Sequence, residues 1–405
     1  MKSGYLSEYF TGVAAKKLSQ VEINPDKSNQ HEFQGIKKLR EILGTDKKTF
    51  SARFIYFGED AEDTLIVEDT VTWYDAREKQ PHRSPEFRLY FPAAATSITE
   101  KAESGDLLII GRRPDESISV IIAQGNSTIE NQLLWLFGIE QGDGSLYNKF
   151  TVKEIGKGIS LNYTEKIILQ QIGIEIEDQD ESFLELLLKQ FSTGFPSTRI
   201  FSEFSRGTLK DVCPIKDPDQ ALWKWMEREE VLFKTLEKYV VGARLRQGFA
   251  DDVDGFIEFS LSVQNRRKSR VGYAFENHLE KIFMDNGIKY SRNKVTENNS
   301  KPDFIFPGIR EYHDTKYPNE RLTMLGVKTT CKDRWRQVLA EAERVSSKHL
   351  ATLEPGISIN QTNEMKAVNL NLVLPKSLHE TYMESQKAVL LSLSDFILFV
   401  RQKQT

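Results

Sequence analysis

The sequence predicts a two-domain α+β protein, with a β-rich N-terminal half followed by a mixed α/β C-terminal half. The length of 405 residues corresponds to two or three domains at roughly 150 residues each. Short β-branched and aromatic runs dominate residues 1–165, whereas helical patterns alternate with short strands after the acidic run EIEDQDES. We therefore expect domains over 1–170 and 191–405, joined by a linker over 171–190.

The N-terminal half is expected to form a small β-barrel-like domain. Residues 49–57 alternate apolar and polar side chains, and residues 65–74 and 87–91 are rich in β-branched or aromatic side chains. Residues 106–124 hold DLLIIG and ISVIIAQ around the turn RRPDES, which is the pattern of a hairpin. A helix is expected over 129–139. Several short strands with one or two helices are typical of barrel-like β domains.

The C-terminal half alternates helices with strands. The expected helices span 182–191, 221–247, 268–286 and about 333–348, with a closing helix in SDFILFVRQ. The expected strands lie near 288, over 303–306 and 322–330, and in VNLNLVLP. This pattern predicts a mixed sheet with helices on its faces.

Composition and charge exclude several classes of protein. Apolar residues make up 39 % and charged residues 28 %, so the chain is neither disordered nor membrane-spanning. A net charge of −4 excludes a uniformly basic DNA-packaging protein but allows a local basic surface. Two cysteines are too few for a disulfide framework and form no CxxC motif, and the histidines show no zinc-binding spacing. Without an apolar leader or membrane span, we expect a cytoplasmic protein with no membrane contact.

The residues that carry chemistry lie within 301–344. Lys301-Pro302-Asp303 opens a predicted strand, and Lys328 ends another strand 25 residues after Asp303. If the strands are adjacent, Asp303 and Lys328 meet at one end of the sheet. An Asp that binds Mg²⁺ and a Lys that stabilises developing charge serve metal-assisted phosphodiester hydrolysis. This is the PD-(D/E)xK nuclease pattern, except that Gly326 replaces the usual second acid. The alternative is that Asp303 caps a turn and Lys328 is solvated.

The segment KTTCKDRWRQ, from Lys328 to Gln337, resembles the motif of the EcoRII-type (type IIE) restriction endonucleases almost letter for letter. NRRKSR, KPDF, YHD and the Met324-Leu325 pair look like the same family. Weaker similarity extends from about Phe195 to the C-terminus, so the resemblance covers roughly the last half of the chain. It implies a restriction-endonuclease-like domain that uses Mg²⁺ to cut double-stranded DNA at sites with CC/GG ends, such as CCWGG.

The resemblance also assigns the catalytic groups. In this subgroup the second carboxylate stands on the following helix, and the residue two before the Lys is small. The matching acid is Glu341, 13 residues after Lys328. Asp303 and Glu341 would then hold the metal, and Lys328 would stabilise the transition state. The alternative for Glu341 is a surface ion pair with Arg344 or Arg336.

Two further residues match positions of the same family. Glu276 is a candidate for a second metal or water role, and a helix-surface ion pair is its alternative. Tyr312 is a candidate nucleophile, although a structural or DNA-contacting tyrosine fits better because the Asp303 and Lys328 scheme already supplies a water nucleophile.

Candidate DNA contacts follow the catalytic lysine and precede the catalytic strands. Lys332-Asp333-Arg334, with Arg336 nearby, is by resemblance the element that reads CC/GG half-sites, because Arg recognises guanine and Asp accepts from the cytosine amino group. Its alternative is a charged first helical turn in which the helix dipole favours Asp333. Residues 264–294 hold eight basic and three acidic residues. The phosphate-binding candidates among them, with a solvated face as alternative, are Arg266, Arg267, Lys268 and Arg270.

The N-terminal half carries a thinner resemblance to the pseudobarrel with which this family binds a second, effector copy of its site. HEFQG begins with His31, DAR ends with Arg77, and RSPEFR contains Arg83, Glu86 and Arg88. These five residues are candidate effector-DNA contacts, and an exposed polar loop is the alternative. The effector sequence stays open.

Together these features predict a Mg²⁺-dependent type II restriction endonuclease of a host defence system. We expect a homodimer through the C-terminal domain, because two strands of a symmetric site require two active sites. The first alternative is a DNA-binding regulator or defence sensor with an inactive nuclease domain, which would bind DNA without cutting it. The second is an active nuclease that responds to modified DNA.

Overall fold

The computed structural model describes residues 5–23, 31–33, 37–58, 63–80, 82–139, 151–155, 161–174, 176, 181–192, 194–331 and 334–405. The chain forms two compact units. The N-terminal unit comprises Ser3–Ile176 with Gly356–Asn360, and the C-terminal unit is built from Glu177–Pro355 and Gln361–Thr405, with Met1–Lys2. The predicted α+β fold class is confirmed.

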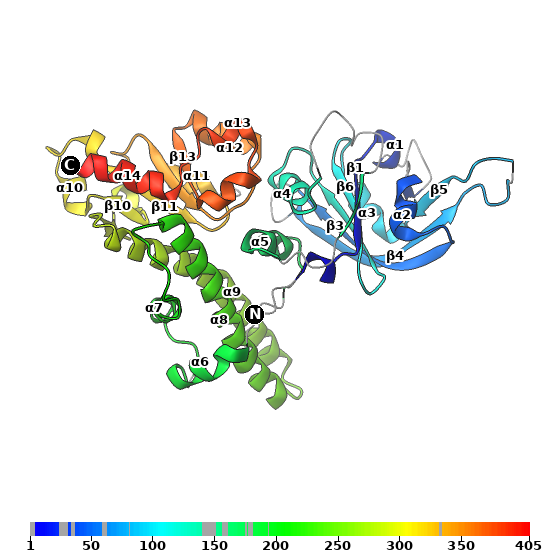
Figure 1. Cartoon of the computed structure of the whole chain (residues 1–405), viewed down its shortest axis with the longest axis horizontal. Helices are drawn as coiled ribbons and strands as arrows, with labels where there is room; N and C mark the ends of the chain where they lie inside the picture. The colour runs from blue at the N-terminus through cyan, green and yellow to red at the C-terminus, as the bar shows by residue number, and fades with distance from the viewer. Residues whose placement is uncertain are drawn as a thin grey trace. The chain divides into compact units, whose positions relative to one another are not determined.

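The described part of the N-terminal unit contains one curled eight-stranded sheet with the order β2-β5-β4-β3-β7-β6-β1-β8 (Figure 1). Its strands are β1 (Gly12–Lys17), β2 (Glu32–Phe33), β3 (Lys48–Phe57), β4 (Leu65–Asp75), β5 (Phe87–Tyr90), β6 (Leu107–Arg112), β7 (Ile118–Ala123) and β8 (Thr151–Glu154). The neighbours are antiparallel except for β3 and β7. The α-helices are α1 (Gln20–Ile23), α2 (Arg40–Leu43), α3 (Thr96–Thr99), α4 (Thr128–Leu136) and α5 (Tyr163–Gln171).

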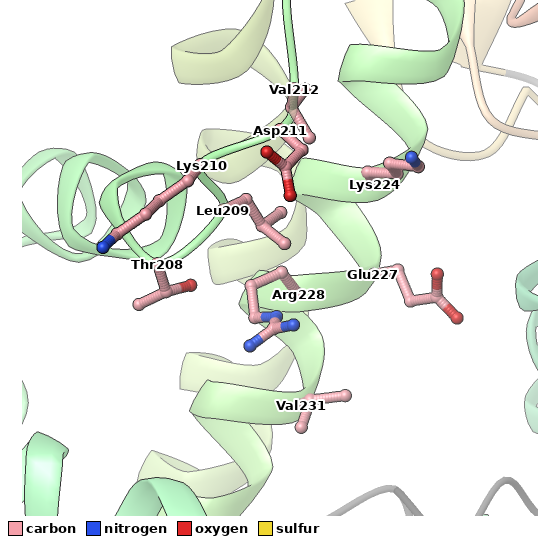
Figure 2. Close-up of a pocket in the computed structure, with 9 residues that line it drawn as sticks. All are labelled: Thr208, Leu209, Lys210, Asp211, Val212, Lys224, Glu227, Arg228 and Val231. Carbon is pink, nitrogen blue, oxygen red and sulfur yellow. The ribbon is translucent and has the colours of Figure 1, made fainter.

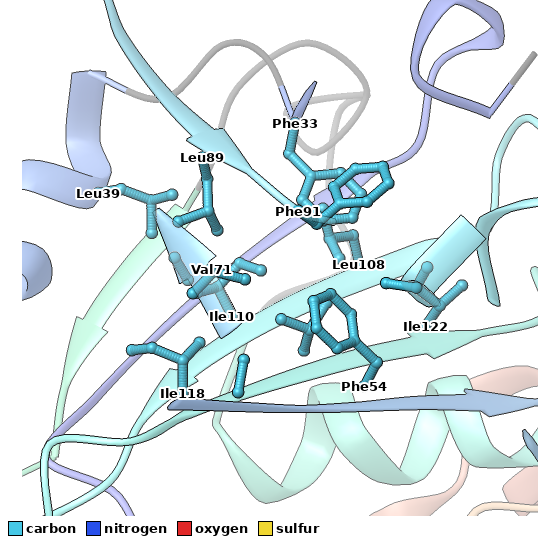
Figure 3. Packing of buried hydrophobic residues seen from close by; sticks show 14 of the residues in the cluster. Phe33, Leu39, Phe54, Val71, Leu89, Phe91, Leu108, Ile110, Ile118 and Ile122 are labelled. Carbon is cyan, nitrogen blue, oxygen red and sulfur yellow. The ribbon is translucent and has the colours of Figure 1, made fainter. Parts of the chain in front are cut away.

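Each face of this sheet carries a hydrophobic core. Successive side chains of a strand point to opposite faces, so Phe54 and Tyr56 of β3 join one hydrophobic core, while Ile55 and Phe57 join another. Figure 3 shows the first core, in which Phe54 lies among aliphatic side chains of neighbouring strands. Burial on both faces explains why β7 is apolar along most of its length instead of alternating.

The described part of the C-terminal unit contains a five-stranded sheet with the order β13-β12-β11-β10-β9. Its strands are β9 (Ser291–Arg292), β10 (Phe304–Phe306), β11 (Thr323–Lys328), β12 (Lys348–Thr352) and β13 (Leu370–Val373). β9, β10 and β11 are antiparallel, and β11, β12 and β13 are parallel. The α-helices are α6 (Leu184–Gln190), α7 (Thr198–Gly207), α8 (Pro218–Gln247), α9 (Val253–Asp285), α10 (Ile309–His313), α11 (Trp335–Leu339), α12 (Ile359–Ala367), α13 (Glu384–Lys387) and α14 (Leu393–Gln404).

Helices α8 and α9 form a long antiparallel hairpin (Figure 1). Helix α9 begins at Val253, well before the predicted start at residue 268. Its start is fixed by the side chain of Asp252, which accepts a hydrogen bond from the backbone N–H of Gly255 at 2.8 Å. The first turns of α9 expose apolar side chains such as Phe256, so they lack the one-sided apolar pattern that reveals a helix in a sequence.

The helix predicted over 333–348 is wrong in its C-terminal part. Helix α11 ends at Leu339, and strand β12 begins at Lys348. Ala342 between them has a φ of 51°, which a right-handed helix does not allow. Packing in the folded unit therefore overrides the local helical propensity of this segment.

None of the helices in the described ranges is long and apolar enough to cross a membrane.

Candidate active site

The structure brings Asp303 and Lys328 together at one end of the C-terminal sheet. Asp303 directly precedes β10, Lys328 ends β11, and these two strands pair antiparallel. The Asp303 carboxylate Oδ2 accepts a hydrogen bond from the backbone N–H of Val327 at 2.6 Å and lies 3.4 Å from the Lys328 Nζ. Asp303 thus binds the neighbouring strand instead of capping a local turn. Both side chains are mostly buried, with exposed fractions of 14 % and 13 %.

Glu341 completes this cluster from the turn that follows α11. Burial of its carboxyl and the nearby charge of Asp303 raise the pKa of Glu341 to about 7, against the opposite effect of Lys328 and Lys348. Its Oε2 is buried and has no hydrogen-bond partner among the described residues. Two adjacent carboxylates, one with an unsatisfied oxygen, are the donor set that Mg²⁺ prefers, so these residues fit the metal that the sequence implies.

The alternative interpretation of Glu341 as a surface ion-pair partner is not favoured. Arg336 pairs with Glu364 at 2.8 Å. Arg344 directs its guanidinium to main-chain carbonyls, including those of Asp314 at 2.9 Å and Tyr317 at 2.7 Å.

The packing around Gly326 explains why the usual second acid is absent from β11. A Cβ atom added at Gly326 would lie 2.8 Å from Cγ2 and 3.0 Å from Cγ1 of Val338. Val338 is fully buried in α11, so this helix fills the space that an acidic side chain would need. A carboxylate has to reach the site from another element, and the turn after the same helix supplies Glu341.

Glu276 forms an ion pair with a residue of the neighbouring strand β9. Its carboxylate pairs with the guanidinium of Arg292 on β9 at 2.8 Å, and Arg292 also binds Glu280 at 2.8 Å. In the part of the chain that the structure describes, no three Asp, Glu, His or Cys side chains form a group that could hold a metal ion. The ion-pair alternative for Glu276 describes this contact, and its metal role stays a prediction.

Tyr312 is a buried structural residue in this arrangement. Its side chain is 1 % exposed, and its hydroxyl donates to Glu297 Oε2 at 2.5 Å. Burial and the hydrogen bond to Glu297 raise the pKa of Tyr312 well above its ordinary value. Both effects disfavour a tyrosinate nucleophile, and the structural alternative for Tyr312 agrees with these contacts, while its catalytic role stays a prediction.

The candidate base-reading segment lies just beyond Lys328. Lys332 and Asp333 fall outside the described residues. Arg334 is exposed at the start of α11, and Arg336, two residues later, keeps 57 % of its side chain exposed while pairing with Glu364.

The basic cluster at 266–270 divides between two faces of α9. Arg270 is only 5 % exposed, pairs with the carboxylate of Glu230 on α8, and stacks over the Phe233 ring at 4.1 Å. The guanidinium is enclosed between helices, which disfavours the predicted phosphate contact of Arg270. Of the others, Arg266 is half-buried over the ring of Phe195, Arg267 pairs with Glu237 at 2.8 Å, and Lys268 is exposed.

Three of the N-terminal candidates lie together where β4 and β5 meet. The Glu86 carboxylate pairs with both Arg77 and Arg88, the latter at 2.8 Å, and Arg88 also binds Glu32 at 2.7 Å. The hydrogen bond from Arg88 and the charge of Arg77 lower the pKa of Glu86.

The other two N-terminal candidates point elsewhere. Arg83 is exposed, and its Nη1 lies 3.5 Å from Gln80 Oε1. The His31 ring packs edge-on against Phe91, and its Nδ1 lies 3.3 Å from the Thr96 hydroxyl.

Sequence reasoning missed two features of the C-terminal unit. The first is Lys348, which is buried and donates to the main-chain oxygen of Glu341 although it looks like a surface lysine in sequence. The second is a pocket of about 510 Å³ between α8 and the segment before it (Figure 2). The pocket is lined by Thr208, Leu209, Lys210, Asp211, Val212, Lys224, Glu227, Arg228 and Val231. For the pocket, the available sequence signal was the spacing of Lys224 and Arg228, which lie one helical turn apart.

Comparison with known proteins relates this chain to restriction enzymes. Residues 233–397 match the family model described as EcoRII C terminal. Type II restriction enzyme EcoRII from Escherichia coli is 46 % identical over 226 residues, which is 56 % of this chain and 55 % of that protein. Type II restriction enzyme SsoII from Shigella sonnei is 30 % identical over 130 residues, covering 29 % of this chain and 40 % of that protein. The chain thus spans about half the length, or less, of these curated relatives.

Two solved structures are also similar. Metal-depleted Ecl18kI in complex with uncleaved, modified DNA matches with a TM-score of 0.44 at 20 % identity, over 56 % of this chain and 85 % of that chain. The complex of restriction endonuclease PspGI with substrate DNA matches with a TM-score of 0.44 at 18 % identity, over 52 % of this chain and 93 % of that chain.

Proposed function

We propose that this chain, whose residues 233–397 match the family model described as EcoRII C terminal, is a Mg²⁺-dependent type II restriction endonuclease that hydrolyses phosphodiester bonds of double-stranded DNA at specific sites. The observation that carries the proposal is the convergence of Asp303, Lys328 and Glu341 at one sheet end, with an unsatisfied carboxylate oxygen among them.

Each of these side chains has a distinct part in the proposed reaction. Asp303 and Glu341 would hold Mg²⁺, which, when bound, lowers the pKa of a coordinated water and polarises a phosphoryl oxygen. The backbone N–H of Val327 fixes the orientation of the Asp303 carboxylate. Lys328 keeps its ammonium group 3.4 Å from Asp303, where it can stabilise the negative charge that develops on the attacked phosphate.

The segment after Lys328 would read the DNA sequence. Arg334 is exposed and can contact guanine in the major groove, whereas Asp333 can accept from the cytosine amino group. Together with Lys332 they would select sites with CC/GG ends, such as CCWGG. Arg336, Arg266, Arg267 and Lys268 would contact the phosphate backbone.

The N-terminal unit would bind a second, effector copy of a DNA site. The cluster of Arg77, Glu86 and Arg88 supports this proposal, because two guanidinium groups keep the Glu86 carboxylate charged and ready to accept a hydrogen bond. Arg83 and His31 are further candidate contacts of the N-terminal unit. The C-terminal domains would pair as a homodimer, so that two active sites face the two strands of a symmetric target.

Digestion of unmethylated phage DNA with Mg²⁺ tests the activity. The wild type should give discrete ends at CC/GG-type sites, and sequencing of these ends gives the specificity. Asp303→Ala and Glu341→Gln should abolish cutting, because each removes a proposed metal ligand. Glu380→Gln, which changes an exposed carboxylate of the same unit, is the matched control and should cut normally.

The alternatives give different results in the same experiment. A protein that retards DNA on a gel and never cuts it, even with excess site-bearing oligonucleotide as effector, would be a DNA-binding regulator. Cutting of methylated DNA alone would identify a modification-dependent nuclease.

A further inference from the structure

The segment that presents Glu341 has little support from regular secondary structure. We call residues 341–345, between α11 and β12, the Glu341 turn. Within it the Val345 N–H bonds to the Ala342 carbonyl at 2.9 Å, and Ala342 has a φ of 51°. A left-handed residue other than glycine persists only where its surroundings hold it in place.

The ammonium group of Lys348 binds the carbonyls of this turn. Its Nζ donates to the main-chain oxygens of Glu341, Ala342 at 3.0 Å and Val345 at 3.1 Å. An ammonium group has three hydrogens, so these bonds use its whole donor capacity. Lys348 is 8 % exposed and stands at the first position of β12, whose backbone is fixed by pairing with β11 and β13.

Two other side chains bind the amides of the same turn. The Tyr312 hydroxyl accepts from the Arg344 N–H at 3.3 Å. Glu297, in the short 3₁₀ helix η6 (Glu297–Asn299), accepts from the Glu343 N–H at 3.3 Å and from the Tyr312 hydroxyl at 2.5 Å. The carbonyls and amides of the Glu341 turn are therefore held by side chains from three separate elements.

We propose that Lys348 and Tyr312 are positioning residues, which hold the Glu341 turn so that the Glu341 carboxylate meets Asp303 at the metal. In the usual pattern the second acid stands on a strand, and the sheet fixes its backbone. In this chain Val338 occupies that space, and the two side chains supply the rigidity that the turn lacks. The proposal rests on the proposed function, because it assigns a metal to Glu341.

Metal binding by the full-length protein provides the test. Lys348→Met keeps the length of the side chain but removes all three donors, whereas Lys348→Arg keeps donors. Binding of Mn²⁺ measured by calorimetry, and the Mg²⁺ concentration for half-maximal cleavage, should both weaken about 10- to 100-fold in Lys348→Met. Lys348→Arg should recover part of this loss. Lys366→Met, at an exposed position of α12, should bind Mn²⁺ like the wild type.

Tyr312→Phe is the second variant. If Lys348→Met does not fold, Tyr312→Phe tests the proposed positioning role instead. It removes one hydroxyl and keeps the buried ring, so Mn²⁺ binding should weaken while cleavage at saturating Mg²⁺ persists. Wild-type affinity for Mn²⁺ in Lys348→Met, or in Tyr312→Phe where that variant decides, would overturn the proposal. A wild type that binds no Mn²⁺ would also overturn it. A wild type that binds Mn²⁺ more tightly than both variants but never cuts DNA would instead overturn only the proposed activity.

Discussion

The ionised Glu341 carboxylate destabilises the folded protein, and a bound cation would remove this free-energy cost. Its carboxyl is largely enclosed, and the charge of Asp303 lies beside it, so its pKa is raised from an ordinary 4.5 to about 7. A carboxyl whose pKa is raised by folding favours the protonated form, so its ionisation opposes folding. This cost is absent below pH 4.5, grows as the pH rises toward 7, and is fully present above pH 7.

The variant Glu341→Gln should therefore melt at a higher temperature than the wild type at pH 8 in EDTA, and at nearly the same temperature at pH 4.5. Addition of Mg²⁺ at pH 8 should raise the melting temperature of the wild type and leave that of the variant unchanged, because a ligand stabilises only the state that binds it. Thermal unfolding at the two pH values measures both effects. A variant that is less stable than the wild type at pH 8 in EDTA would mean that the ionised carboxylate stabilises the fold.

At the level of the element, the basic residues 266–270 of α9 have two different surroundings. Successive residues of a helix are about 100° apart, so side chains two positions apart point in nearly opposite directions. Arg270 accordingly faces α8 and pairs with the buried Glu230, whereas Lys268 faces solvent. The same stretch of sequence thus contributes an internal ion pair and a surface cation.

Substitutions at these two positions should separate DNA binding from folding. Lys268→Gln should weaken DNA binding and lower the slope of log affinity against log salt by about one, with unchanged unfolding in urea. Arg270→Met should cost about 3–5 kcal/mol of stability, because the buried Glu230 then loses its close partner and keeps only the Lys234 ammonium group, 3.8 Å away. DNA binding by fluorescence anisotropy over a salt series, together with urea unfolding, measures both. An Arg270→Met protein of full stability with a reduced salt slope would place Arg270 at the DNA instead.

The elements that the sequence predicts well are those whose pattern is local. The alternation of β3, the hairpin of β6 and β7, and the closing helix α14 are confirmed. The start of α9 was missed although its capping residue Asp252 is local, because its first turns expose apolar side chains such as Phe256 and lack a one-sided apolar pattern. The end of α11 was missed because it depends on a turn at Ala342 that distant side chains hold.

The residues of the candidate site likewise differ in how far the local sequence predicts them. Asp303 and Lys328 follow from a motif on two strands that proved to be adjacent. Glu341 was reached only through family resemblance, because the steric reason for its position is the contact between Gly326 and Val338 across the fold. No sequence pattern near Lys348 indicates that its ammonium group binds three carbonyls, since the partners depend on the path of the chain from α11 to β12.

For the whole molecule, the separate hydrophobic cores of the two units are the feature that matters for stability. Phe54 is fully buried in a core of the N-terminal unit. In the C-terminal unit Phe283 of α9 packs against Phe304, Phe306 and Phe396, with ring centroids 5.2, 5.3 and 6.2 Å apart. The domain boundaries at 170 and 191 stay a prediction, and independent cores imply that each unit can unfold without the other.

Calorimetry should accordingly resolve two unfolding transitions, and a matched pair of variants should assign them. Phe54→Ala should lower the temperature of one transition and Phe283→Ala that of the other. Each substitution should reduce the unfolding free energy of its unit by about 3–5 kcal/mol, because each deletes a large buried side chain from a different core. Mg²⁺ should raise only the transition that Phe283→Ala lowers, since Asp303, Lys328 and Glu341 belong to that unit. A single transition that both variants and Mg²⁺ shift together would mean that the chain unfolds as one cooperative body. In that case effector DNA bound to the N-terminal unit would affect cleavage by stabilising the whole chain, because the two units would not unfold separately.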